Sequence, residues 1–151
     1  MTAPAADPLQ RFVQAQERDY AQALAELRAG RKTSHWIWYV LPQLRGLGHS
    51  PLSQHYGLAG REEAAAYAAH PLLGPRLVDC VQAMLGHAGL SARQILGEVD
   101  ALKFRSCLTL FAEVAPGEPC YRAALERFYG GERDAATLGL LSGGCQAQEG
   151  R

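Results

Sequence analysis

The stretch Lys32-Thr33-Ser34-His35-Trp36-Ile37-Trp38-Tyr39-Val40-Leu41-Pro42-Gln43 decides how this chain folds. From His35 to Leu41 large side chains follow one another, and at roughly 100° per residue they would point in every direction around a helix. A helix that is apolar all round is a buried one. Ser34 is a candidate N-cap, and the segment ends before Pro42. The same residues have high β-propensity, so a buried strand is the alternative at this point.

On both sides of this segment the hydrophobic spacing predicts helices. Upstream, Asp7-Pro8 starts a helix and Gly30 ends it. Residues 42–60 are rich in Gly, Ser and Pro and are expected to be irregular, which in a connection this long is typical of a functional loop. Further helices are expected over residues 61–69, 72–87, 91–96, 100–114, 121–129 and 134–141.

No alternating strand and no internal repeat is visible, so the sequence predicts an all-α fold. The expectation is a single multihelical domain of about seven to eight helices, with buried central helices, over residues 7–141. Residues 1–6 and 142–151 are expected to be flexible ends.

The composition excludes several classes of protein. Fifteen basic and fifteen acidic residues among 151 give a net charge of zero, which argues against a nucleic-acid or anionic-membrane partner. No apolar run approaches the length of a membrane span, and the N-terminus lacks a signal-peptide pattern. The four cysteines form no metal-binding or redox motif, so we expect reduced thiols, a cytoplasmic location, no cofactor and no metal. The oligomeric state stays open.

The two lysines of the chain, Lys32 and Lys103, both fall in candidate site segments. On a helical wheel Lys103 lies inside an apolar stripe, where an ammonium needs a partner. Asp100, three residues earlier, is the expected partner. His35 beside the tryptophans is a candidate general base with its pKa tuned by burial. His35, Asp100 and Lys103 are therefore the candidate catalytic residues, and structural roles in packing or ion pairing are the alternative.

Three further features suggest a ligand site. Tryptophan faces can stack on a planar ligand, the glycine loop after Gln43 lets the backbone approach an anion, and a helix start near His70 offers free amides and Arg76. In each case ordinary packing, a plain loop or a tight turn is the alternative. The candidate ligand-binding residues are Lys32, Ser34, Trp36, Trp38, Gln43, Gly46, Gly48, Ser50, His70, Arg76 and Ser106.

Several motifs in this order resemble a bacterial family of small, multihelical cytosolic proteins of unknown function, some of which have been misnamed calpastatin. The family normally has a second serine where this chain has Cys107. The resemblance implies an all-α fold with buried central helices and supplies no activity. The matching motifs are Lys32-x-Ser34-His35-Trp36-x-Trp38-Tyr39, Pro42-Gln43, Gly46-Leu47-Gly48-x-Ser50, His70-Pro71-x-x-Gly74-x-Arg76-Leu77, Asp100-x-x-Lys103-x-x-Ser106, Thr109-Leu110-Phe111 and Phe128-x-x-Gly131-x-x-Asp134-x-x-Thr137-Leu138.

The His-Pro-x-Leu stretch before Arg76-Leu77 is also faintly similar to helical families that process ADP-ribose and related N-glycosides. Two functions follow as hypotheses. The first is a pocket for an anionic ligand, such as a nucleotide-like or ADP-ribose-like molecule, with hydrolysis or transfer at a nucleotide-derived glycosidic bond as the expected reaction if the site is catalytic. The second is a protein-interaction module without chemistry.

Overall fold

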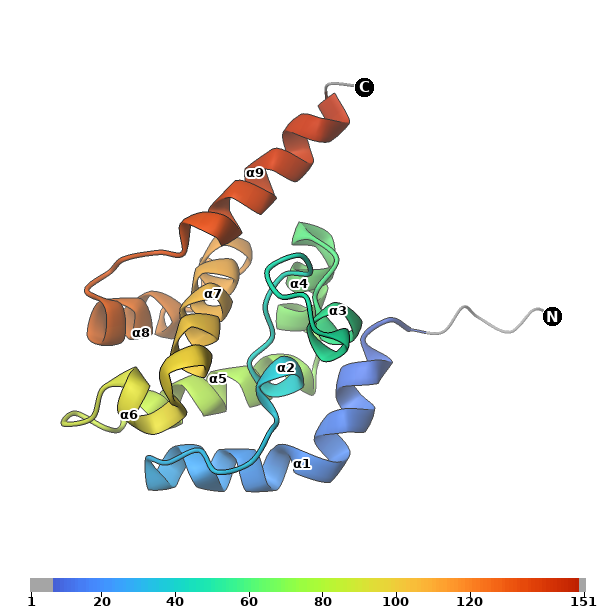
Figure 1. The fold of residues 1–151 in the computed structure, drawn as a ribbon. Helices are drawn as coiled ribbons and strands as arrows, with labels where there is room; N and C mark the ends of the chain where they lie inside the picture. The colour runs from blue at the N-terminus through green and yellow to red at the C-terminus, as the bar shows by residue number, and fades with distance from the viewer. Residues whose placement is uncertain (1–6, 150–151) are drawn as a thin grey trace.

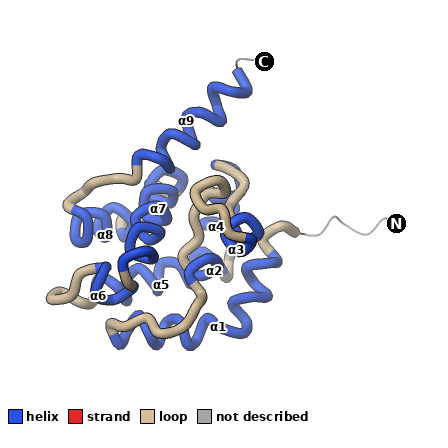
Figure 2. Tube along the Cα trace, in the orientation of Figure 1, coloured by secondary structure: helices blue, strands red, loops and turns tan. Residues whose placement is uncertain are grey.

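The computed structural model describes residues 7–149, with side chains described through residue 142, and this part of the chain is entirely helical apart from turns and loops (Figures 1 and 2). The predicted all-α fold is confirmed. Within residues 7–149, an isolated bridge between Leu44 and Leu58 is the only β-type pairing. None of the described helices is long and apolar enough to cross a bilayer. The helices are α1 (Gln10–Ala29), α2 (Ile37–Val40), α3 (Pro51–Tyr56), α4 (Arg61–Ala69), α5 (Leu73–Leu85), α6 (Ala92–Leu96), α7 (Glu98–Val114), α8 (Cys120–Tyr129) and α9 (Ala135–Glu149).

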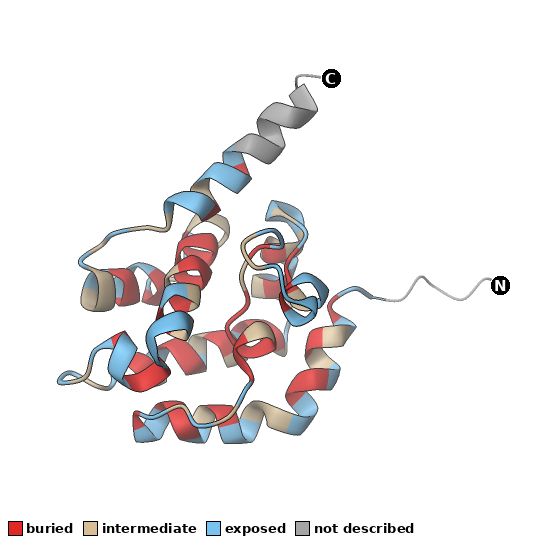
Figure 3. Ribbon diagram, viewed as in Figure 1, coloured by how far each residue is buried: buried red, intermediate tan, exposed pale blue. Residues whose placement is uncertain are grey.

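Helix α7 runs through the middle of the fold and packs on α4, α6, α8 and α9 (Figure 1). Phe104, Leu108 and Phe111 on this helix are fully buried. Helix α5 lies against α1, α4 and α8, and the inward faces of these helices form one continuous core (Figure 3). The large apolar residues of the α2 segment, Trp36 and Ile37, belong to the same core, so burial of this segment is as expected.

The predicted helix ends are largely confirmed, because each has a local chemical cause. Gly30 adopts φ +80°, a left-handed conformation that ends α1. Ser91 and Gln94 form a reciprocal capping box at the start of α6. Asp134 accepts a hydrogen bond from the Thr137 backbone N–H at 2.9 Å, as a cap of α9 does.

Three expectations about local structure were wrong. Ser34 does not cap the buried segment, since its hydroxyl donates to Glu26 instead and the helix spans only Ile37–Val40. Part of the expected irregular stretch is helical: α3 begins at Pro51, and Ser50 caps it by accepting from the Ser53 backbone N–H. Helix α9 continues to Glu149, beyond the expected end at residue 141. The expected flexible segment 1–6 lies outside the described residues, and the domain boundaries stay predictions.

Candidate functional site

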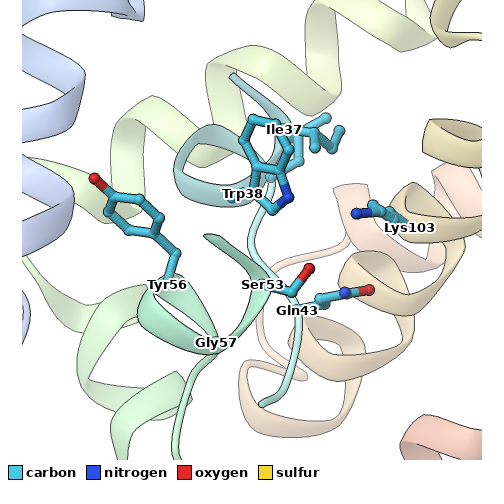
Figure 4. A pocket seen from close by; sticks show the side chains of 8 residues that line it. Ile37, Trp38, Gln43, Ser53, Tyr56, Gly57 and Lys103 are labelled. Atoms are coloured by element: carbon cyan, nitrogen blue, oxygen red, sulfur yellow. The ribbon is translucent and has the colours of Figure 1, made fainter. Parts of the chain in front are cut away.

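A slot lies where α2 and the loop after it meet α3 and the middle of α7 (Figure 4). Its cavity volume is only about 10 Å³, room for one water. None of the lining residues is acidic, and one is a cation. They are Ile37, Trp38, Leu41, Gln43, Ser53, Tyr56, Gly57 and Lys103.

Trp38 and Lys103 face each other across this slot (Figure 4). The Lys103 ammonium lies 5.6 Å from the centre of the Trp38 ring, within the range of a cation–π contact. The buried Trp38 indole N–H has no hydrogen-bond partner among the described residues. Lys103 makes no ion pair within the same part of the chain. The slot therefore contains the Lys103 ammonium and the buried Trp38 N–H, and neither has a hydrogen-bond acceptor or a counter-ion among the described residues.

Two more polar groups reach the slot from its loop side. Gln43 contributes a side-chain amide with two N–H donors. The Ser50 hydroxyl donates to the Ser53 Oγ at 3.0 Å, so the Ser53 hydroxyl hydrogen stays available for another acceptor. The Tyr56 hydroxyl, by contrast, points away from the slot (Figure 4). The polar groups that converge are thus mainly hydrogen-bond donors.

Close backbone packing holds the loop around the slot. The Gln43 carbonyl accepts from the Leu58 N–H at 3.0 Å, and the Leu58 carbonyl accepts from the Arg45 N–H at 2.8 Å. A Cβ at Gly57 would lie 2.6 Å from the Arg45 Cα, and one at Gly48 would lie 2.5 Å from the Ser53 Oγ. Glycine is therefore required at both positions for this packing.

A second polar cluster surrounds the carboxylate of Glu26 on α1, which is only 8% exposed. It accepts from the backbone N–H groups of Thr33 (2.8 Å) and Ser34 (3.0 Å), from the Ser34 hydroxyl and from the Trp36 indole N–H (2.9 Å). Burial raises the pKa of Glu26, but these hydrogen bonds and one from Gln22 outweigh it and hold the pKa well below its usual range. Ser34 and Trp36, predicted to bind ligand, thus use their polar groups inside the protein.

The predicted pairing of Asp100 with Lys103 was wrong. Asp100 Oδ2 lies 2.8 Å from Lys32 Nζ, and the Lys32 ammonium also donates to the Ser34 carbonyl at 2.6 Å. Lys32 lies 5.0 Å from the centre of the Trp36 ring. Proximity in sequence favoured Lys103 as the partner of Asp100, but in the folded chain the loop after α1 places Lys32 beside Asp100 instead.

The expected burial of His35 was also wrong, because its side chain is exposed one residue before the buried Trp36. His35, Asp100 and Lys103, the predicted catalytic residues, therefore do not gather around one cavity. Lys103 lines the slot, Asp100 is paired with Lys32, and His35 faces solvent.

The other predicted residues lie in different surroundings. Ser50 caps α3, next to the slot. His70 Nδ1 accepts from the backbone N–H groups of Leu72 and Leu73, at the start of α5, at 3.0 and 3.2 Å.

The remaining predicted residues make contacts within the protein. Arg76 lies 4.6 Å from the centre of the Tyr20 ring and donates to Gln16 at 3.4 Å. Ser106 donates to the Leu102 carbonyl one turn earlier at 3.3 Å. Gly46 has φ +104° and lies near Leu140 of α9.

The structure thus brings Trp38, Gln43 and Lys103 together and adds Ser53 and Tyr56, which follow the glycine loop in sequence but were not among the predicted site residues. Ser53 and Tyr56 were hidden in a stretch expected to be irregular, although Ser50-Pro51 is a helix-start signal that identifies α3. Glu26 carried no such signal, because an acidic residue on an amphipathic helix ordinarily faces solvent.

A protein-family model described as "Protein of unknown function (DUF1810)" matches residues 6–141 of the chain. No curated protein matches it. Among solved structures, the chain is similar to the conserved hypothetical protein Rv1873 from Mycobacterium tuberculosis, with 48% identity and a TM-score of 0.88. The similarity covers 90% of this chain and 99% of that one. Neither description names an activity.

Proposed function

Because the chain belongs to the DUF1810 family of proteins of unknown function, we propose its function from the slot itself: the protein binds the anionic group of a small ligand between α2, α3 and α7. The observation that carries this proposal is the buried Trp38 indole N–H, which has no acceptor among the described residues and lies beside Lys103. A buried donor without an acceptor costs about 1–3 kcal/mol. A bound anion removes that cost and also gains the attraction of the ammonium.

The size of the slot limits what enters it. Ligand pockets for drug-sized molecules have volumes of about 300–1,000 Å³, whereas the cavity volume of this slot is only about 10 Å³, room for one water. A whole nucleotide therefore does not fit as the slot stands. One oxygen of a phosphate or carboxylate group takes the place of that water, and the rest of a nucleotide-like or ADP-ribose-like ligand lies over the rim near Gln43 and Tyr56.

Binding is better supported than hydrolysis. Cleavage of a glycosidic bond needs a carboxylate or another acid–base group at the reacting atoms. The lining of the slot contains no carboxylate and no imidazole. Hydrolysis is therefore tested separately: ADP-ribose is incubated with the protein, and NMR shows whether its glycosidic bond is cleaved.

The proposal is tested by the thermal stability of the protein in the presence of acetate, inorganic phosphate, pyrophosphate, AMP and ADP-ribose at constant ionic strength. A ligand present at about 100 times its Kd stabilises the folded state by about 2.7 kcal/mol. Lys103→Met and Trp38→Phe should lose this gain. Arg93→Met, which removes one positive charge at an exposed site on α6, should keep it.

An unchanged gain in stability in Lys103→Met would contradict the proposal, as would the absence of any gain across the panel of anions. The second result favours the interaction module. Its supporting observation is the exposure of Val99 (65%) and Leu102 (58%), which lie three residues apart on α7.

The proposal includes a cytoplasmic location and no nucleic-acid partner. Cys80, Cys107 and Cys120 are free and buried in the described part of the chain, which supports a reducing compartment. The zero net charge supports the absence of a nucleic-acid partner.

A further inference from the structure

A second and larger hollow lies on another part of the molecule, where the end of α4 and the start of α5 meet the segment that joins α7 to α8. Its volume is about 380 Å³, within the usual range for a site that holds a small organic molecule. Ala68, Val78 and Ala115 contribute apolar walls. We call this hollow the α5–α8 groove.

The charge of the α5–α8 groove is opposite to that of the slot. Asp79 on α5 and Glu118 before α8 both line it, and none of its lining residues is basic. Neither carboxylate forms an ion pair with a described residue. Glu118 Oε2 accepts from the Cys120 backbone N–H at 3.2 Å, and the Cys120 thiol also hydrogen-bonds to the Glu118 carboxylate. Two acceptors with negative charge therefore border one apolar hollow.

A buried polar group also lines the α5–α8 groove. Tyr121 is only 1% exposed, its ring packs on Phe111, and its hydroxyl makes no hydrogen bond to a described residue. Burial raises the pKa of Tyr121, and the nearby Cys120, Cys107 and Glu118 raise it further. The phenol is therefore neutral, and it offers a ligand both a donor and an acceptor.

A metal ion does not explain this arrangement. The described residues contain no group of three His, Cys, Asp or Glu side chains that could hold a metal ion, and two carboxylates with apolar walls lack the oxygen ligands that Ca²⁺ or Mg²⁺ requires. Apolar walls suit instead a cation that carries a hydrocarbon chain.

We propose that the α5–α8 groove binds an aliphatic amine, with the ammonium between Asp79 and Glu118 and the hydrocarbon part against Val78 and Ala115. An ammonium has three donors, which match the two carboxylates and the free Tyr121 hydroxyl oxygen. This site is separate from the slot and does not depend on the function proposed for it.

The test is a titration of the ¹⁵N-labelled full chain with n-butylamine hydrochloride, n-butanol and sodium butyrate, followed by NMR. Butylamine should shift the backbone resonances of residues around Val78 and Ala115 in a saturable way, whereas butanol should bind much more weakly and butyrate should not bind. Asp79→Asn combined with Glu118→Gln should weaken amine binding by roughly tenfold or more, since a tenfold change is about 1.4 kcal/mol.

The matched control combines Glu17→Gln with Glu62→Gln, two exposed carboxylates outside the groove, and changes the net charge equally. It should leave amine binding unchanged. Gln at position 118 keeps an oxygen for the Cys120 N–H, so the double variant is expected to fold, and far-UV circular dichroism checks this. The proposal is overturned if butylamine gives no saturable shifts at the groove, if butyrate binds equally well, or if the folded Asp79→Asn/Glu118→Gln variant binds as the control does.

Discussion

Lys32 and Asp100 form an ion pair of 2.8 Å that joins the loop after α1 to the first turn of α7. Both side chains are largely removed from water, with 7% and 17% exposure. The Lys32 backbone N–H also donates to the Ile95 carbonyl at 2.8 Å, so the same residue ties the loop to α6. This pair positions the segment that leads into Trp36 and Trp38.

Replacing Lys32 by Met should therefore destabilise the protein strongly. The change leaves the Asp100 carboxylate without its partner, and losing one member of a buried ion pair costs about 3–5 kcal/mol. The loss is measured by urea unfolding. Arg93→Met breaks the largely exposed pair with Glu98 (74% exposure on each side) and should cost about 0.5 kcal/mol or less. Equal losses in the two variants would contradict a structural role for the Lys32–Asp100 pair.

Glu26→Gln should destabilise the protein in a pH-dependent way. The pKa of Glu26 is lowered by folding, so its contribution to stability is present above the ordinary value of about 4.5 and is lost as the pH falls below it. The difference in unfolding free energy between the wild type and Glu26→Gln should be about 2–3 kcal/mol at pH 7, because several donors lose a charged acceptor. This difference in unfolding free energy should become smaller as the pH falls below 4.5.

Urea unfolding at several pH values between 7 and 3 measures this difference. Glu17→Gln removes an exposed carboxylate from the same helix and should change stability by about 0.5 kcal/mol or less. A difference between the wild type and Glu26→Gln that stays constant over the whole range would show that the Glu26 pKa is not lowered in the folded state.

Two helical glycines should respond to alanine in opposite directions. At Gly74 an added Cβ would lie 2.3 Å from the Ala68 carbonyl oxygen, a backbone atom that cannot move without separating α4 from α5. At Gly139 in α9 nothing lies within 4 Å of an added Cβ. Gly139→Ala should stabilise the protein by up to about 1 kcal/mol through helix propensity, whereas Gly74→Ala should lower the melting temperature. Stabilisation in both variants would be inconsistent with the close packing of α4 on α5.

Gly48→Ala should close the slot without altering its charges. The new methyl group would lie 2.5 Å from the Ser53 Oγ, which is too close, so the Ser53 side chain must shift. Ser53 is only 6% exposed, so it has little room to do so. We expect the stabilisation by anions to be lost while the protein stays folded, since overpacking costs about 1–3 kcal/mol. Thermal-shift titration measures this. Gly117→Ala, where an added Cβ meets nothing within 4 Å, is the control and should keep the anion effect.

Much of the fold could be predicted because helix ends have local causes. Gly30, the Ser91–Gln94 capping box and Asp134 act through neighbours a few residues away, so their positions in sequence determine their roles. The burial of the segment around Trp36 followed from apolar residues on every side of a short helix. The resemblance to a family of multihelical proteins led to the same fold class.

The candidate site was less predictable, because its contacts join residues distant in sequence. Trp38 and Lys103 are 65 residues apart in numbering and meet only because the fold brings α2 and the middle of α7 to the same slot. Proximity in sequence predicted an ion pair between Asp100 and Lys103, whereas in the folded chain Asp100 pairs with Lys32. His35 stands next to a buried tryptophan and yet is exposed, since adjacent residues near a helix start face different directions.

The most direct test of anion binding in the slot uses the two indole N–H resonances of the ¹⁵N-labelled protein. Trp36 donates to Glu26 at 2.9 Å and is an internal control, while the Trp38 N–H has no acceptor among the described residues; Trp38→Phe assigns the two signals. On titration with inorganic phosphate or pyrophosphate at constant ionic strength, the Trp38 resonance should move downfield and saturate, the Trp36 resonance should stay in place, and Lys103→Met should abolish the effect. A Trp38 resonance that does not move, or one that moves equally in Lys103→Met, would contradict the account.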